Sequence, residues 1–328
     1  MRRTLIVSGR FWRVFALCAV VLAAAAVSGP RANADAPTTV RIGYQRSSTL
    51  ISLLKADGSL ERALAERGVK ISWHEFTSGL PLLEALNLGG VDFSADVADT
   101  VPVFAQAAGA KLVYVAEEAP SPAAQAILVH GNSLISSVEQ LKGKKIAVTK
   151  GAGSHYLLLA ALAKAGLTIK DVTPAYLTPA DGRAAFVSGA VDAVVIWDPF
   201  LASIQAQSDA RILADGTGLA SYKRYYLTTK DFAARGGDLV GIIVAQLKEA
   251  GSAVKADPKQ AAEKLSGLWS MEAATVEKAN GRRSYKVGLV TRDGLAEQQK
   301  IADAFAAEGL FPKKVDASDV AIWSPSTQ

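Results

Sequence analysis

Gly89-Gly90-Val91-Asp92 and Gly189-Ala190-Val191-Asp192 are two similar stretches that lie one hundred residues apart. Each follows apolar residues at helical spacing and leads into a short hydrophobic segment typical of a strand. Upstream of each copy, another strand-like segment leads into a polar helix start, Ser47-Ser48-Thr49 or Gly153-Ser154-His155. A single stretch of this kind could simply be the end of a helix before a strand, because glycine commonly ends helices. Two copies in matching context favour two similar α/β lobes with a ligand-binding cleft between them.

The rest of the chain extends this pattern. Strand-like and helix-like segments alternate from position 39 to about 230, which predicts parallel sheets covered by helices on both faces. Beyond position 230 the pattern becomes helical, with an amphipathic stripe at Val240, Ile243, Val244 and Leu247. The expected strands are 40–44, 69–76, 91–95, 112–116, 126–130, 145–149, 174–177 and 191–197. The expected helices are 50–66, 80–88, 101–108, 137–142, 155–165, 182–188, 200–207, 238–255, 258–268, 272–280 and 293–308.

Two segments have the composition of connections between lobes. Residues 117–122 are polar and contain two prolines, and residues 215–218 are glycine-rich. Both are also compatible with ordinary surface turns, but they bracket the second repeat. We therefore expect hinge crossings at these segments, with 123–214 as one lobe and 35–118 plus 219–328 as the other.

The first 34 residues have the pattern of a secretory signal. Arg2, Arg3, Arg10 and Arg13 form a basic start, and an apolar run from 14 to 27 follows. Because this run is short for a membrane span, we expect cleavage near Ala34 and export to the periplasm, rather than a retained anchor. The paired arginines also fit twin-arginine export, so both export routes remain open.

Export changes the composition of the chain. The one cysteine, Cys18, lies in the apolar run, so the mature chain has no thiol nucleophile, thiolate metal site or disulfide. Removal of the five basic residues before position 35 leaves 31 basic and 31 acidic side chains. This balance gives no indication of a nucleic-acid partner.

The sequence lacks the residue patterns that most catalytic sites and metal sites require. His74, His130 and His155 are scattered, and no carboxylate pair accompanies them at ligand spacing. The sequence contains no Gly-x-Ser-x-Gly elbow, and Gly151-Ala152-Gly153 lacks the remaining residues of a nucleotide-binding loop. We therefore predict no metal, no cofactor and no catalytic residue.

Anion binding is the chemistry that the helix starts favour. Ser47-Ser48-Thr49, Thr100 and Ser154 each begin a helix after a strand, where free N–H groups and the helix dipole attract anions. The same residues are equally explained as helix caps. Trp197-Asp198 ends a buried strand at the sheet edge where such folds bind ligands, although a core tryptophan and a capping aspartate explain it equally well.

Motifs along 40–323 resemble the periplasmic aliphatic-sulfonate-binding proteins of ABC importers, which are related to taurine- and nitrate-binding proteins. The resemblance implies a two-lobed type II periplasmic-binding-protein fold, and a monomer that delivers a sulfonate to a permease at the inner membrane. The motifs are Gly43-Tyr44-Gln45, Leu83-Glu84-Ala85-Leu86, Gly90-Val91-Asp92-Phe93, 104–109, 141–145, 155–158, Trp197-Asp198-Pro199-Phe200, 215–218 and Arg282-Arg283-Ser284-Tyr285.

The resemblance also implies which residues form the pocket. Matching positions indicate ligand contacts at Gln45, Thr100, Ser154, His155, Trp197, Asp198 and Arg283, and Ser47 and Asp96 are further candidates at positions that depart from the family pattern. Asp96 and Val97 depart from the family pattern, which usually has a small Gly/Thr-rich loop there. An aspartate facing the pocket is expected to repel a bare alkanesulfonate and to favour one that carries an amine, such as taurine. Nitrate, a thiamine-precursor pyrimidine and an enzyme on the same fold remain alternatives.

Overall fold

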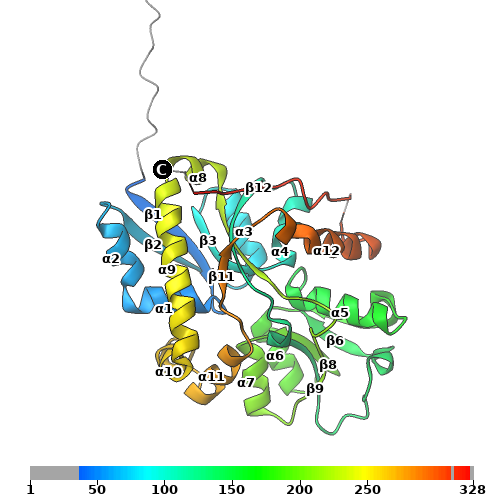
Figure 1. The fold of residues 1–328 in the computed structure, drawn as a ribbon. Coiled ribbons are helices and arrows are strands. Elements are labelled where there is room, and N and C mark those ends of the chain that lie inside the picture. Colours follow the sequence, from blue (N-terminus) through cyan, green and yellow to red (C-terminus); the bar gives the residue numbers. More distant parts are fainter. Residues whose placement is uncertain (1–36, 312–313, 326–328) are drawn as a thin grey trace, which may run out of the picture. The chain divides into compact units, whose positions relative to one another are not determined.

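Two mixed β-sheets organise the residues that the computed structural model describes, which are 37–311 and 314–325 (Figure 1). The predicted signal segment 1–34, with its cleavage site and Cys18, lies outside the described residues. The first sheet contains β1 (Thr39–Gln45), β2 (Lys70–Phe76), β3 (Phe93–Ala98), β4 (Leu112–Glu118), β10 (Arg224–Thr229), β11 (Val287–Leu289) and β12 (Ala321–Ile322). The second contains β5 (Gln125–Val129), β6 (Lys145–Val148), β7 (Thr173–Tyr176), β8 (Ala193–Trp197) and β9 (Arg211–Asp215).

The two sheets share one strand arrangement. The first has the order β11-β4-β10-β3-β1-β2, with β12 beside β4, and the second has the order β7-β6-β8-β5-β9. In both, the strand after a Gly-x-Val-Asp stretch lies parallel to the first strand of its repeat: β3 beside β1, and β8 beside β6. We call the first sheet with its helices lobe 1, and the second sheet with its helices lobe 2.

The repeated aspartate joins these strands in the same way in both lobes. A carboxylate oxygen of Asp92 accepts the Arg41 N–H at 2.8 Å, and one of Asp192 accepts the Lys145 N–H at 2.7 Å. The preceding glycines, Gly89 and Gly189, have φ values of 73° and 74°, which glycine adopts most easily at a helix end. The motif therefore ends a helix and also fixes the next strand.

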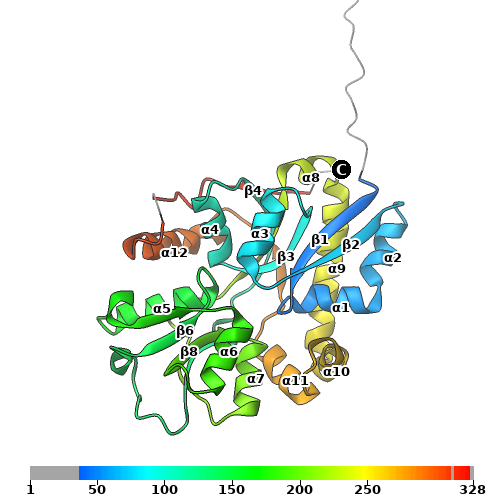
Figure 2. The same ribbon diagram turned by 180° about the vertical axis from the view of Figure 1, so that it is seen from behind.

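Helices cover both faces of each sheet (Figure 2). In lobe 1, α1 (Thr49–Asp57), α2 (Ser59–Ala65) and α9 (Gly237–Ala256) bury one face, and α3 (Gly79–Asn87) and α4 (Thr100–Ala107) bury the other. In lobe 2, α5 (Gly153–Lys164) lies opposite α6 (Pro179–Val187) and α7 (Phe200–Gln207). Short 3₁₀ turns occur at Pro122–Ala124, Val138–Leu141, Ile169–Asp171 and Asp293–Leu295.

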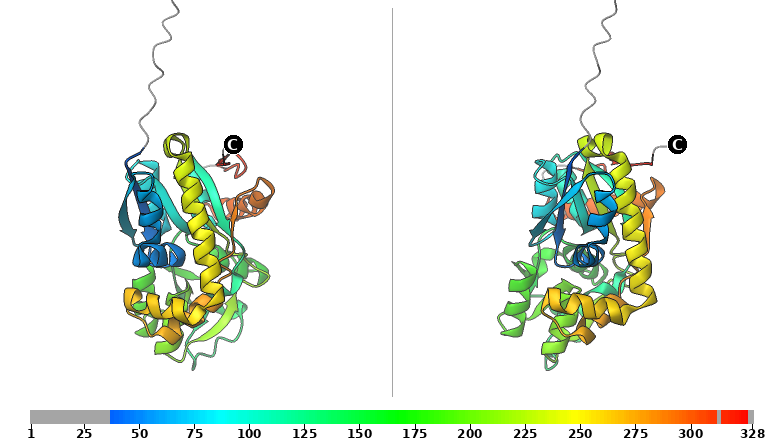
Figure 3. Two further views of the ribbon diagram at one scale, coloured as in Figure 1. Left: turned by 60° about the vertical axis from the view of Figure 1, so that its left-hand side comes forward. Right: turned by 90° about the vertical axis from the view of Figure 1, so that its left-hand side faces the viewer.

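The helical C-terminal region contacts both lobes. It contains α8 (Lys230–Arg235), α9, α10 (Pro258–Trp269), α11 (Ala273–Gly281) and α12 (Ala296–Ala307). Figure 3 shows the yellow α9 upright, with α10 and α11 at its lower end. The predicted stripe on α9 is confirmed, since Val240, Ile243, Val244 and Leu247 are all buried. Helix α11 packs against α7 of lobe 2, and α12 contacts both α4 and α5.

Three expectations need correction. The sheets are mixed rather than parallel, because β10 and β5 run antiparallel to their neighbours. The expected helix 50–66 is interrupted at Gly58, whose φ of 68° ends α1. The expected helix 137–142 is only the short turn Val138–Leu141. Within the described residues, no helix is sufficiently long and apolar to span a membrane.

Candidate functional site

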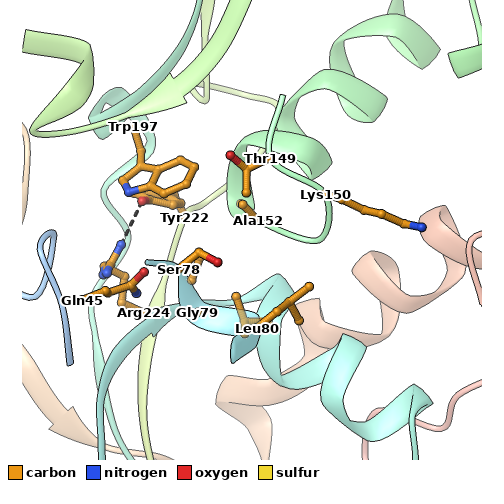
Figure 4. Close-up of a pocket in the computed structure, with 13 residues that line it drawn as sticks. Gln45, Ser78, Gly79, Leu80, Thr149, Lys150, Ala152, Trp197, Tyr222 and Arg224 are labelled. Atoms are coloured by element: carbon orange, nitrogen blue, oxygen red, sulfur yellow. Dashed lines mark hydrogen bonds between the residues drawn. The ribbon is translucent and has the colours of Figure 1, made fainter. Parts of the chain in front are cut away.

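A cavity lies between the two lobes, near the carboxyl ends of β1, β3, β6 and β8 (Figure 4). The space among its lining residues, including the part open to solvent, is about 330 Å³. The lining residues are Gln45, Ser78, Gly79, Leu80, Ala98, Val101, Thr149, Lys150, Ala152, Gly153, Trp197, Tyr222 and Arg224. The enclosed part is much smaller, so only a small ligand suits this arrangement of the lobes.

Two helix N-termini border this cavity, one from each lobe. Ser78-Gly79-Leu80 begins α3 and Ala152-Gly153 begins α5, and neither helix has a side-chain cap. The first N–H groups of a helix have no partner within the helix, and the helix dipole makes this end attractive to anions. Glycine is required at Gly153, because a Cβ there would lie 2.6 Å from the Tyr222 ring. Both helix starts can therefore donate backbone N–H groups to a bound anion.

Arg224, from β10, is the cationic side chain most deeply buried at the cavity. Its Nε donates to Asp96 Oδ2, its Nη1 to the Tyr222 hydroxyl at 2.9 Å, and its Nη2 to the Asp96 carbonyl at 3.0 Å. A longer contact of 3.4 Å joins Nη2 to Ser47 Oγ. A guanidinium has five N–H groups. Four are used, so one on Nη1 has no partner within 37–311 and 314–325.

Asp96 was predicted as a ligand contact, but in this structure its carboxylate contacts protein cations. Asp96 is buried, does not line the cavity, and accepts hydrogen bonds from Arg224 and from Arg283 Nη2 at 3.0 Å. Val97 is buried in the core rather than placed in the cavity. Two guanidinium groups thus balance the charge of Asp96, which removes the expected repulsion of a bare alkanesulfonate.

Arg283 and Ser47 support the cavity rather than line it. Arg283 donates to the Ser47 carbonyl at 2.8 Å and to Glu118, which in turn accepts the Tyr226 hydroxyl at 2.7 Å. Both residues were predicted as ligand contacts, and in this structure they contact other parts of the protein. The pKa of Arg283 lies well above its usual value despite burial, because Glu118 and other acidic groups surround it.

Trp197 and Asp198 have separate roles. Trp197, a predicted ligand contact, lines the cavity, and its ring centroid lies 6.1 Å from that of Phe200 in an edge-on arrangement. Asp198 accepts the Ala202 N–H at 3.0 Å and two bonds from Arg282 Nη1 at 2.9 and 3.0 Å. Burial raises the pKa of Asp198 to about 7, although Arg282 opposes this shift. Asp198 therefore pairs with a protein cation rather than with a ligand.

The predicted residues Thr100, Ser154 and His155 lie next to the lining residues but not among them. Thr100 Oγ1 donates to the Gly151 carbonyl at 2.8 Å, and the Gly151 N–H donates to His155 Nδ1 at 3.2 Å. Burial lowers the pKa of His155 to about 4, so it is a neutral acceptor at physiological pH. Ser154 Oγ is buried without a partner among the described residues.

Gln45, another predicted ligand contact, lines the cavity, and its Nε2 donates to the Asp96 carbonyl at 3.1 Å. Sequence reasoning missed the start of α3, Tyr222 and Arg224. Tyr222 has a φ of 52°, which is strained for a tyrosine and occurs mainly at functional sites. Within the described residues, no group of three or more His, Cys, Asp or Glu side chains is arranged to hold a metal ion.

Comparisons with known proteins identify the family. Residues 64–261 match the family described as NMT1/THI5 like. A relative from Escherichia coli (strain K12), whose name is that of an aliphatic sulfonates-binding protein, is 41% identical over 89% of this chain and 91% of its own. The chain belongs to the family of aliphatic sulfonate-binding proteins. The resemblance predicted from the sequence is thereby confirmed.

Solved structures agree with the predicted fold. The alkanesulfonate-binding protein SsuA from Xanthomonas axonopodis pv. citri, bound to MOPS, is 39% identical and has a TM-score of 0.83, over 88% of this chain and 99% of that one. The periplasmic aliphatic sulphonate binding protein SsuA from Escherichia coli is 40% identical, with a TM-score of 0.80 over 89% and 94% of the two chains. The predicted periplasmic-binding-protein fold is therefore confirmed.

Proposed function

We propose that this protein is an extracytoplasmic receptor of an ABC importer, which captures an organosulfonate in the cavity and delivers it to a membrane permease. The observation that carries the proposal is the arrangement of N–H donors at the cavity. Arg224 supplies the remaining N–H of Nη1, and the starts of α3 and α5 supply backbone N–H groups. A sulfonate has three oxygens that accept hydrogen bonds, and donors converging from several directions suit this shape.

The tail of the ligand contacts Trp197, Leu80 and Tyr222 in this proposal. These side chains offer apolar surface, and burial of a methylene group stabilises binding by about 0.8 kcal/mol. The lining residues include no carboxylate, and Asp96, which contacts the lining residue Arg224, is already paired with two arginines. We therefore favour sulfonates with uncharged tails over taurine, whose ammonium group has no partner among the lining residues.

Nitrate and a thiamine-precursor pyrimidine are less well supported. Nitrate has no tail to occupy the surface of Trp197 and Leu80. A pyrimidine is compatible with stacking on Trp197, but it leaves the buried cation Arg224 and the two helix starts without an anion. Loss of such partners is costly in a buried site.

An enzyme on this fold is also less well supported. Such an enzyme would need titratable groups in the cavity, and the obvious candidates are His155 and Asp198. His155 accepts a bond from the Gly151 N–H, and Asp198 is paired with Arg282. Neither lines the cavity, so neither is placed to exchange a proton with a ligand.

Ligand capture by closure of the lobes completes the proposal. The lobes are assigned to 35–118 plus 219–328 and to 123–214, with hinges at 117–122 and 215–218. Two parallel connections of this kind permit rotation about a hinge axis. We also propose that residues 1–34 are removed during export, and that the mature receptor is a periplasmic monomer that contacts the permease at the inner membrane.

A thermal-shift panel tests the proposed function. The purified protein is heated with alkanesulfonates, taurine, sulfate, nitrate or a thiamine-precursor pyrimidine. A ligand at 100 times its Kd adds about 2.7 kcal/mol of stability, so alkanesulfonates are expected to raise the melting temperature most. A shift with another class and none with sulfonates contradicts the substrate, and turnover of a bound compound contradicts the receptor role.

A further inference from the structure

A cluster of aromatic side chains joins the lobes beside the cavity. Phe104 of α4 and Phe305 of α12 come from lobe 1, and His155 and Tyr156 come from α5 of lobe 2. The centroid of the Phe305 ring lies 4.6 Å from that of Phe104, 5.2 Å from that of His155 and 6.3 Å from that of Tyr156. We call these four residues the clasp. Phe305 is fully buried between the two lobes.

Helix α12 is attached to lobe 1 independently of the clasp. Gln298, on its first turn, donates to the Asp99 carbonyl at 2.8 Å and to the Tyr114 hydroxyl at 3.3 Å. Gln298 is fully buried, so these bonds are shielded from water. When lobe 2 rotates away, α12 therefore stays with lobe 1 and Phe305 loses its contacts with α5.

A hydrogen bond extends the contact between the lobes toward the cavity. Thr100 Oγ1 of lobe 1 donates to the Gly151 carbonyl of lobe 2 at 2.8 Å. Close approach is possible because residue 151 is glycine, since a Cβ there would lie 2.8 Å from Leu80 Cδ1. The segment after β6, which lines the cavity, is thus held against lobe 1 at the same place as the clasp.

We infer that the clasp sets ligand affinity from outside the cavity, by stabilising the closed arrangement of the lobes. The effect on ligand affinity rests on the proposed function, whereas the contacts of the clasp do not depend on it. Apolar surface that is buried only in the closed form favours that form whether or not a ligand is present. Apparent affinity falls in proportion to the fraction of molecules in the binding-competent form. The clasp residues are therefore positioning residues that need not touch the ligand.

Spin labels on the two lobes provide the test. Leu88 of lobe 1 is 76% exposed and Leu134 of lobe 2 is 94% exposed. Cys18 is the one cysteine of the chain, so L88C and L134C in a C18S background take labels selectively. In ligand-free protein, Phe305→Ala is expected to move the distance distribution between the labels away from that of wild type, toward the open form. Phe305→Leu, which keeps more of the packing, should give a smaller change.

Affinity for hexanesulfonate is measured on the same variants. Phe305→Ala should raise the Kd about tenfold. The control Phe186→Ala removes an equally buried phenylalanine that stacks on His130 within lobe 2, and should change neither the distance distribution nor the Kd. The inference is overturned if Phe305→Ala leaves the distribution unchanged, or if it shifts the distribution without changing the Kd. If wild-type protein binds no sulfonate, the proposed function fails, and the distance distribution alone decides the inference.

Discussion

The guanidinium of Arg224 donates from Nε to the carboxylate of Asp96, and both side chains are buried beside the cavity. Arg283 donates to the same Asp96 oxygen and to Glu118. Two cations and two anions therefore form a balanced buried network, which holds Arg224 in place without cancelling its capacity to donate to a ligand. We therefore expect this network to influence which ligands the cavity binds.

Removal of one anion from this network should be costly. Asp96→Asn leaves two buried guanidinium groups opposite Glu118 alone, and loss of one partner of a buried ion pair costs about 3–5 kcal/mol. Urea denaturation measures the free energy of unfolding. Asp238→Asn is the control, because Asp238 and its partner Arg67 are 61% and 57% exposed and such pairs contribute at most about 1 kcal/mol. Equal decreases in the free energy of unfolding in the two variants would show that the buried network stabilises the fold no more than an exposed ion pair does.

Arg224→Lys should weaken sulfonate binding more than it weakens folding. Lysine keeps the charge but lacks the fork of N–H groups that contacts Asp96, Tyr222 and the cavity. We expect the Kd for hexanesulfonate to rise about a hundredfold, equivalent to about 3 kcal/mol. Calorimetric titration gives the Kd.

The matched control is Lys150→Gln. Lys150 also lines the cavity, but its amine extends away from Trp197 toward the outside (Figure 4). The change in Kd should therefore stay below about threefold, because exposed charges contribute little. A larger effect from Lys150 than from Arg224 would identify Lys150 as the main anion contact instead.

Ligand tails should follow the chemistry of the cavity wall. Each added methylene, from methanesulfonate to hexanesulfonate, is expected to lower the Kd about fourfold while it remains against Trp197 and Leu80. Taurine should bind more weakly than ethanesulfonate, because its ammonium group meets no unpaired carboxylate in the cavity. Competition titrations rank these ligands. Tighter binding of taurine would restore the role for Asp96 that the sequence predicted.

His155 should make stability depend on pH in the acidic range. Its pKa is lowered by burial from 6.5 to about 4. Below pH 6.5 His155 is protonated in the unfolded chain, whereas in the folded chain it stays neutral until about pH 4. The free energy of unfolding therefore falls as the pH drops from 6.5 to 4. The loss is about 3 kcal/mol. Urea denaturation measures the free energy of unfolding at pH 7 and at pH 4. The decrease between these pH values should be larger by this amount in wild type than in His155→Gln. Equal decreases would contradict the prediction.

Much of the fold could be predicted because it repeats. The Gly-x-Val-Asp stretches occupy equivalent places in both sheets, and their aspartates bond to equivalent backbone N–H groups. The strands β9, β10, β11 and β12 were missed. Arg224–Thr229 is buried on both faces, so it lacks the alternation of polar and apolar residues that marks a half-buried strand. Its antiparallel direction follows from the chain's return from lobe 2, which no local pattern encodes.

The candidate site was harder to predict than the fold. Gln45 and Trp197 end strands at the correct sheet edge, and both line the cavity. Asp96 lies near the end of β3 and Asp198 directly follows β8, but both form ion pairs with arginines from a distant segment, Arg283 and Arg282. Arg224 gave no signal, because an arginine within a strand is normally exposed and its buried acid lies 128 residues away. Charge pairing between distant segments is a tertiary property.

A crystal structure of the complex with hexanesulfonate tests the central claim most directly. The account predicts sulfonate oxygens within hydrogen-bond distance of Arg224 Nη1 and of the backbone N–H groups that begin α5, with the tail against Trp197. A sulfonate bound elsewhere, with none of its oxygens near Arg224 or either helix start, would contradict it.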